Sequence, residues 1–175
     1  MGGIVHSGPE HFRPIPEREV PPQILGRFFY DKTRYGSRPD LIPKEETHKD
    51  LETGLGHILV TCDYGGPHSK YDDENQDSFV CGNTKNGDIF IAVIDGAGGS
   101  GGGLEASIKS NSDLANNLVQ GLSPLEGLRS ASGLLIDINE QKKRRAFASG
   151  RSFDFSHEGI YATAVAAKIE KSGRV

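Results

Sequence analysis

The stretch NQDSFVCGNTKNGDIFIAVIDGAGG, residues 75–99, decides the fold of this chain. It contains two runs rich in β-branched and aromatic residues, 77–82 and 88–95. Between them lies an Asn-Gly pair at 86–87, which two-residue hairpin turns favour. The stretch therefore predicts two antiparallel strands, and the similar run HILVTCD at 57–63 predicts a third strand of the same meander.

After the glycines, the apolar pattern predicts two helices. Apolar side chains recur at helical spacing over 104–122, and a second helical stripe covers 125–138. Ser123, just before a proline, is an N-cap candidate for the second helix. The basic cluster QKKRR at 141–145 falls in the last turns, where cations suit the helix dipole. A structural role is thus favoured for this cluster, and binding of a phosphopeptide is the alternative.

The end of the sequence returns to strand character. The run GIYATAVAAKI at 159–169 predicts a strand, and EKSGRV at 170–175 predicts a hairpin turn whose second strand has barely begun. An apolar strand then keeps an open edge, and open edges recruit other strands. We therefore expect an α+β fold, with self-association through that edge.

Composition limits the partners and the location of the chain. The net charge of −4 and the pI near 5.9 argue against a nucleic-acid partner or a membrane surface. No apolar run approaches the roughly 20 residues of a membrane span, so a cytoplasmic protein is expected. Cys62 and Cys81 each lie in a strand-like run and are expected to be buried, reduced thiols.

The prolines divide the chain into two parts. Residues 1–55 hold seven of the nine prolines and many charges, which predicts a Pro-rich N-terminal extension. Its one apolar patch, ILGRFFY at 24–30, is expected to dock on the domain. Residues 56–175 form that domain.

The predicted hairpin brings two carboxylates together. About eight residues on either side of the turn place Asp77 and Asp95 at the same end of the hairpin. Asp95 also ends a buried strand and precedes glycines, beginning with Gly96, that let backbone carbonyls and substrate come close. Carboxylate and carbonyl oxygens suit a hard divalent cation.

The glycine run allows another interpretation. Gly96, Gly98 and Gly101 form a Gly-x-Gly-x-x-Gly pattern between a strand and a helix, as in dinucleotide-binding proteins. That fold needs a second parallel strand after the first helix, whereas a second helix follows here. A Walker loop is excluded because no Gly-Lys-Ser/Thr closes the run.

These residues resemble the first two signature blocks of the PPM family, the metal-dependent, type-2C-like Ser/Thr protein phosphatases. The blocks are NQDSF at 75–79 and IFIAVIDGAGG at 89–99, followed by GGGLEAS, and 159–169 is loosely similar to the family's Gly-Thr-Thr strand. The resemblance covers roughly 57–175. It implies a β-sandwich flanked by antiparallel helix pairs, of which this chain would hold about the first half.

The resemblance also implies a site and a reaction. Asp95 would bridge two magnesium or manganese ions, Gly96 would offer its carbonyl to one ion, and Asp77 would act through metal-bound water. Metal-activated water would then attack a phosphorylated Ser/Thr protein without a covalent intermediate. Carboxylate ligands favour magnesium or manganese over zinc.

Two departures from the family pattern bear on activity. Where the family places a phosphate-binding Arg, this chain has the acidic run YDDEN with Asp72, and the nearest cation is Lys70, our weak candidate for phosphate binding. The family's Gly-Asp-Ser-Arg strand and C-terminal aspartates would lie after Val175. The alternative function is therefore a non-catalytic, truncated phosphatase-fold protein that binds a partner.

Overall fold

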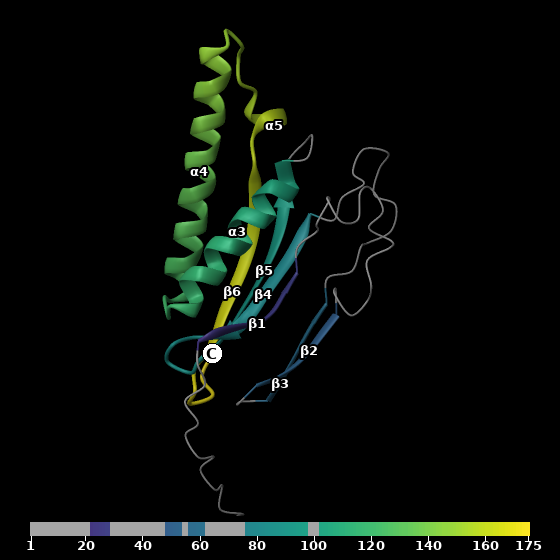
Figure 1. The fold of residues 1–175 in the computed structure, drawn as a ribbon, viewed down its shortest axis with the longest axis vertical. Helices are drawn as coiled ribbons and strands as arrows, with labels where there is room; N and C mark the ends of the chain where they lie inside the picture. The colour runs from purple at the N-terminus through teal and green to yellow at the C-terminus, as the bar shows by residue number, and fades with distance from the viewer. Residues whose placement is uncertain (1–21, 29–47, 54–55, 62–75, 98–101) are drawn as a thin grey trace, which may run out of the picture.

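The computed structural model describes part of the chain in detail, namely residues 22–28, 48–53, 56–61, 76–97 and 102–175. The fold is α+β. A four-stranded antiparallel sheet carries α3 (Gly102–Val119) and α4 (Pro124–Ala148) on one face. A separate two-stranded sheet packs against its other face, so the described elements form three layers (Figure 1).

The four-stranded sheet has the order β1-β4-β5-β6, and every neighbouring pair is antiparallel. Its strands are β1 (Gln23–Phe28), β4 (Asp77–Asn83), β5 (Ile89–Ala97) and β6 (Tyr161–Ile169). The second sheet pairs β2 (His48–Thr53) with β3 (Gly56–Thr61). A short helix, α5 (Phe155–Glu158), precedes β6.

The predicted three-stranded meander is wrong in one respect. The hairpin of β4 and β5 forms as expected, but β3 pairs with β2 in the other sheet. The neighbour of β4 is instead β1, where Phe28 stacks on Phe79 with ring centroids 6.2 Å apart. β3 packs face-on through Ile58 and Val60, which share one face of the strand, while Leu59 points away and is 73% exposed.

The core lies on both faces of β4 and β5. Alternate side chains face the helices, including the fully buried Val80 and Phe90. The others, including Phe79 and Cys81, face β2 and β3. This two-sided burial explains the nearly continuous apolar runs of the two strands.

The predicted extension contributes strands to this architecture. β1 overlaps the apolar patch at 24–30, and β2 lies just before residue 55. The predicted boundary between 55 and 56 falls inside the β2–β3 pair, and its place as a domain boundary stays a prediction.

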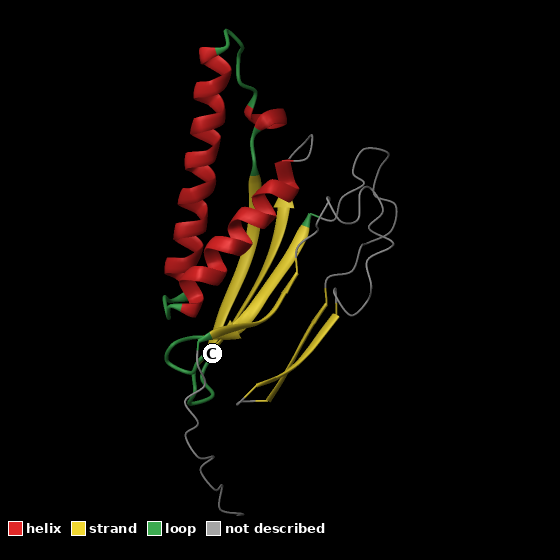
Figure 2. Cartoon of the chain, in the orientation of Figure 1, coloured by secondary structure: helices red, strands yellow, loops and turns green. Residues whose placement is uncertain are grey.

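The helix α4 begins as predicted. Ser123 is its N-cap and Pro124 its first residue, and Ser123 and Glu126 form a reciprocal capping box. The C-terminal part of α4 projects beyond the strands and lies near α5 (Figure 2). Among the described residues, no helix has the length and apolar character needed to cross a membrane.

Candidate metal centre

The hairpin places the two candidate carboxylates directly opposite one another. Asp77, the first residue of β4, is the register partner of Asp95 in β5, as the hairpin prediction required. The register follows from a three-residue turn, 85–87, in place of the two-residue turn that the Asn-Gly pair favours: the N–H of Thr84 donates to the carbonyl of Asp88, and Gly87 takes a φ of +81° that favours glycine. Opposed residues in an antiparallel pair have Cβ atoms about 5 Å apart. One end of the hairpin thus carries both acids on the same face.

That face is the one turned away from the helices. Ile94 is fully buried toward α3 and α4, so the next side chain, Asp95, points to the opposite side and is exposed. Asp77 is partly exposed. The carboxylate of Asp95 is therefore accessible to solvent and to ions.

A third oxygen-bearing side chain lies in the same row. Thr163 of β6 is the register partner of Asp95 on its other side and is exposed. Asp77, Asp95 and Thr163 thus follow one another across three adjacent strands. Sequence reasoning did not single out Thr163, because the register of β6 against β5 depends on a pairing across some 70 residues; the only signal was the loose Gly-Thr-Thr similarity.

The glycines next to Asp95 serve a packing role. Gly96 is buried, and a Cβ there would overlap the carbonyl group of Gly103 in the first turn of α3. A Cβ on Gly103 would in turn overlap the side-chain amide of Gln76. The backbone N–H of Gly96 donates to the carbonyl of Gln76 at 3.1 Å. These glycines let the end of β5, the start of β4 and the start of α3 meet at backbone distance.

The carbonyl of Gly96 belongs to this junction. Its oxygen would lie 2.8 Å from a Cβ on Gly103, so it faces the beginning of α3. Its role as a metal ligand stays a prediction. Lys70, Asp72, Gly98 and Gly101 lie outside the described residues.

The described ranges contain no cluster of three or more His, Cys, Asp or Glu side chains that could hold a metal ion. What they bring together is the pair Asp77 and Asp95, with Thr163 beside it. Magnesium commonly binds proteins through one or two carboxylates and keeps several waters. A carboxylate pair of this kind therefore fits a partly hydrated magnesium or manganese ion.

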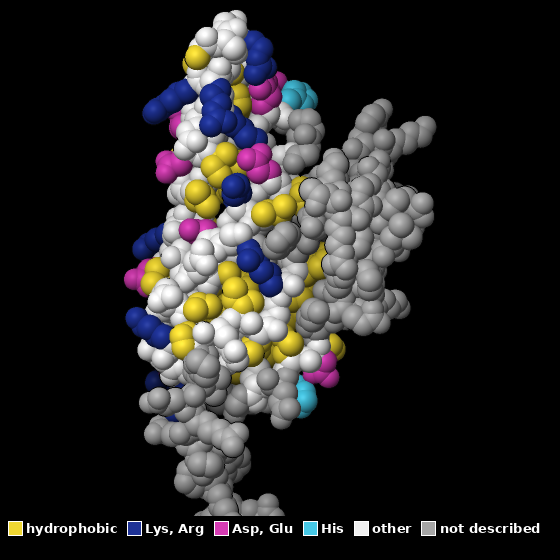
Figure 3. All heavy atoms as spheres, viewed as in Figure 1, with side chains coloured by type: hydrophobic (Ala, Val, Ile, Leu, Met, Phe, Trp, Pro, Cys, Tyr) yellow, Lys and Arg dark blue, Asp and Glu magenta, His cyan; other side chains and the backbone are white. Residues whose placement is uncertain are grey.

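The basic cluster lies elsewhere. Lys and Arg side chains gather over the C-terminal part of α4 (Figure 3). Lys142 Nζ lies 2.6 Å from a carboxylate oxygen of Glu105 in α3, and Lys143 lies over the ring of Phe155 at 5.6 Å. These contacts tie α4 to α3 and α5, which supports the structural interpretation of the cluster.

Cys81 is buried, as expected, and Cys62 lies outside the described residues. Burial raises the pKa of Cys81 to about 11, so the thiol stays protonated at neutral pH. It faces β1 and β3 on the packed side of the sheet and takes no part in the carboxylate row.

Comparison of the chain with models of protein families, with curated proteins and with solved structures gives no match. The functional assignment of the carboxylate row rests on its own residues and on the sequence motifs around it.

Proposed function

We propose that this chain carries part of the catalytic domain of a PPM-type, metal-dependent Ser/Thr phosphoprotein phosphatase. In this proposal Asp77, Asp95 and the carbonyl of Gly96 hold two magnesium or manganese ions. The observation that carries it is the direct cross-strand pairing of Asp77 with Asp95 at the end of β4 and β5.

Such a pair has a physical cost that a cation offsets. Like charges directly opposite each other destabilise an antiparallel pair. Both acids are nonetheless placed on one accessible face, at the point where glycines bring three backbone segments together. A divalent ion between the carboxylates turns their repulsion into two attractive contacts.

The layer order supports the proposed fold. An antiparallel helix pair covers one face of the sheet, and a second small sheet packs on the other. This is the order expected for one half of a helix-flanked sandwich. The residues have simple roles in it: Asp95 and Asp77 fix the ions, and Thr163 offers a hydroxyl beside Asp95 to orient a phosphate oxygen.

Bound there, the ions would supply an activated water and neutralise phosphate charge. The substrate class, a phosphorylated Ser/Thr protein, follows from the family resemblance. The second candidate is a non-catalytic binding protein of the same fold, and the observation that favours it is the outer edge of β6, with which no strand of the described ranges pairs.

Calorimetric titration with manganese tests the site. We expect Asp95→Asn to weaken binding by about tenfold or more and Asp77→Asn by less, since a bridging carboxylate contacts both ions. Asp137→Asn, an exposed acid on α4, is the matched control and should leave binding unchanged. If neither strand variant changes manganese binding, Asp77 and Asp95 are not metal ligands, and the Asp95-Gly96 motif only turns the chain.

Hydrolysis of p-nitrophenyl phosphate separates the two candidates. Manganese-dependent turnover that Asp95→Asn abolishes supports the phosphatase. Manganese binding without turnover favours the non-catalytic alternative.

A further inference from the structure

The start of α3 packs against the end of the hairpin that carries the two carboxylates. Asp77 and Asp95 lie on the face turned away from the helices, so the residues that follow them, Ser78 and Gly96, turn toward α3. Both of these residues are buried. In Figure 1, α3 begins beside the end of β5. The backbone that carries each carboxylate is therefore within reach of α3 through the next residue of its strand.

Gly103, in the first turn of α3, contacts the end of β5 at backbone distance. A Cβ on Gly103 would lie 2.8 Å from the carbonyl oxygen of Gly96 and would overlap the side-chain amide of Gln76. An amide at the end of a flexible side chain can move aside, but the carbonyl is part of the strand. A methyl group at position 103 must therefore displace either the start of α3 or the backbone that directly follows Asp95.

One turn further along α3, Ser107 contacts the other strand of the hairpin. Its hydroxyl donates to the hydroxyl of Ser78 at 2.8 Å, and both side chains are fully buried. Ser78 directly follows Asp77 in β4. A buried hydroxyl that loses its partner keeps its desolvation cost, so this hydrogen bond holds the helix to the strand.

We propose that the first two turns of α3 position the metal centre, with Gly103 as the positioning residue for Asp95 and Ser107 as the positioning residue for Asp77. This role rests on the function proposed above. Two carboxylates that share an ion need a fixed spacing, although their like charges repel each other. Ligands bind a metal more tightly when the groups behind them hold them in place. The contacts of α3 supply that support from the opposite face of the sheet.

The same contacts predict a two-way link between α3 and the ion. Coupling between two sites is reciprocal, so a helix position that favours metal binding is itself stabilised when the metal binds. An ion bound to Asp77 and Asp95 should therefore slow amide exchange in the first turns of α3, even though α3 lies on the face of the sheet away from these carboxylates.

Gly82 provides a matched control for Gly103. It lies at the other end of β4, about 17 Å along the strand from Asp77. A Cβ on Gly82 would overlap the carbonyl oxygen of Gln23 in β1. Gly82→Ala thus creates the same kind of backbone clash as Gly103→Ala, but far from the carboxylates.

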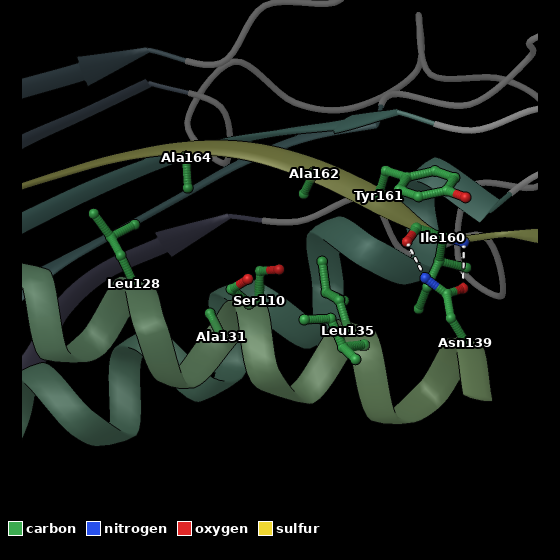
Figure 4. A pocket seen from close by; sticks show the side chains of 11 residues that line it. Ser110, Leu128, Ala131, Leu135, Asn139, Ile160, Tyr161, Ala162 and Ala164 are labelled. Carbon is green, nitrogen blue, oxygen red and sulfur yellow. Dashed lines mark hydrogen bonds between the residues drawn. The ribbon is translucent and has the colours of Figure 1, made fainter. Parts of the chain in front are cut away.

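Ser110 provides a matched control for Ser107. It is also buried on α3, but it lines a cavity of about 340 Å³ that α3, α4 and β6 enclose (Figure 4). Ser110→Ala therefore removes a buried hydroxyl from the part of α3 that faces α4 and β6, and leaves the hydrogen bond to Ser78 intact.

Calorimetric titration of the whole chain with manganese tests the positioning role. We expect Gly103→Ala to weaken binding by about fivefold and Ser107→Ala by about threefold. Gly82→Ala and Ser110→Ala should stay within about twofold of wild type. Urea unfolding without metal measures how far each variant destabilises the fold. Gly82→Ala should lower the urea midpoint and still bind manganese normally, which separates positioning from stability.

Amide exchange gives a second measurement. In wild type, manganese should slow exchange at 104–108 by a larger factor than at 140–146, in the part of α4 that projects beyond the strands. Gly103→Ala should reduce this difference. If Gly103→Ala does not fold, the comparison of Ser107→Ala with Ser110→Ala decides.

Failure of the metal centre and failure of the positioning role give different results. If wild type binds no manganese, the proposed phosphatase site is wrong and α3 has no ion to position. If wild type binds manganese and both Gly103→Ala and Ser107→Ala bind it as tightly, only the positioning role is wrong. Equal weakening by Gly82→Ala and Gly103→Ala would also overturn that role, because affinity would then follow the overall stability of the fold.

Discussion

The two edges of the four-stranded sheet are finished in different ways. β1 has six residues, and its pairing with β4 shifts register between Ile24 and Gly26. The guanidinium of Arg27 in β1 donates to Asn111 at 2.5 Å and to Ser112 at 2.6 Å, both in α3. β6 is longer and has no register shift, and within the described residues no arginine ties it to a helix in the same way. One edge is short, irregular and held to a helix, and the other is long and regular.

Each edge is nevertheless fastened to a helix by one buried asparagine. Asn111 of α3 donates to the carbonyl of Phe79 at 2.9 Å and accepts from Arg27, which links β1, β4 and the helix. Asn139 of α4 donates to the carbonyl of Ile160 at 3.0 Å and accepts from its N–H at 2.9 Å, just before β6 begins. The first tie joins two strands to a helix, whereas the second fixes only the entry to β6.

Removing the two asparagines gives the largest expected effects. Asn111→Leu leaves buried polar groups of several segments without a partner, and we expect it to lower the free energy of unfolding by about 3 kcal/mol. Asn139→Leu affects one residue of the backbone and should cost about 2 kcal/mol. Urea unfolding measures both, and Asn116→Leu, exposed on α3, should cost less than about 0.5 kcal/mol. A greater cost for Asn139→Leu would reverse the ranking of the two edges.

The sequence was sufficient for features fixed by nearby residues. The Asn-Gly pair at 86–87 located the turn and so placed Asp77 and Asp95 at the same end of the hairpin. The exact register comes from a three-residue turn, 85–87, and not from the two-residue turn that this pair favours. Ser123 before a proline identified the start of α4. In both cases the signal lies in neighbouring residues, so the prediction needs no knowledge of distant segments.

The sequence alone did not show which strands pair with each other. Alternation shows which side chains of a strand face the core, but not which strand lies beside it, so β1 was not recognised as the neighbour of β4. For the same reason, the sequence did not indicate that Thr163 lies beside Asp95. The sequence interpretation of Gly96 invoked a ligand, because the close contact of Gly96 with Gly103 exists only once β5 and α3 are packed.

The thiol of Cys81 provides a test specific to the β1 side. It donates to the carbonyl of Gly26 at 3.7 Å, at the register shift of β1, and burial raises its pKa to about 11. The folded state therefore favours the protonated thiol. This contribution is complete below the unfolded pKa of about 8.5 and is lost as pH rises toward 11.

We expect wild type to lose about 2 kcal/mol more than Cys81→Ala between about pH 8 and pH 11. Lysines and tyrosines titrate in both proteins, so the difference between the two urea-unfolding series isolates the thiol. Amide exchange should rise first in β1 and β4. Parallel pH series for the two proteins would mean that the thiol ionises in the folded state without penalty.

The smallest expected effect concerns α4, the helix that covers the β6 side. The hydroxyl of Ser123 accepts from the N–H of Glu126, and the carboxylate of Glu126 accepts from the N–H of Ser123 at 2.9 Å and from its hydroxyl at 2.7 Å. Ser123→Ala removes the hydroxyl from this capping box and should cost about 1 kcal/mol. Ser130→Ala changes an exposed serine within the same helix and is the control. It should cost nothing, since alanine has the higher helix propensity.

The capping box should also depend on pH. The two hydrogen bonds from Ser123 lower the pKa of Glu126, so the stabilisation from the Glu126 carboxylate is present above the ordinary glutamate pKa and is lost as pH falls through the lower folded value. The gap between wild type and Ser123→Ala should therefore narrow below about pH 4. In Ser123→Ala, amide hydrogen exchange should become faster in α4 and β6, while β1 stays protected by Arg27 and Asn111. Equally faster exchange at both edges would show that the two sides of the sheet unfold as one unit.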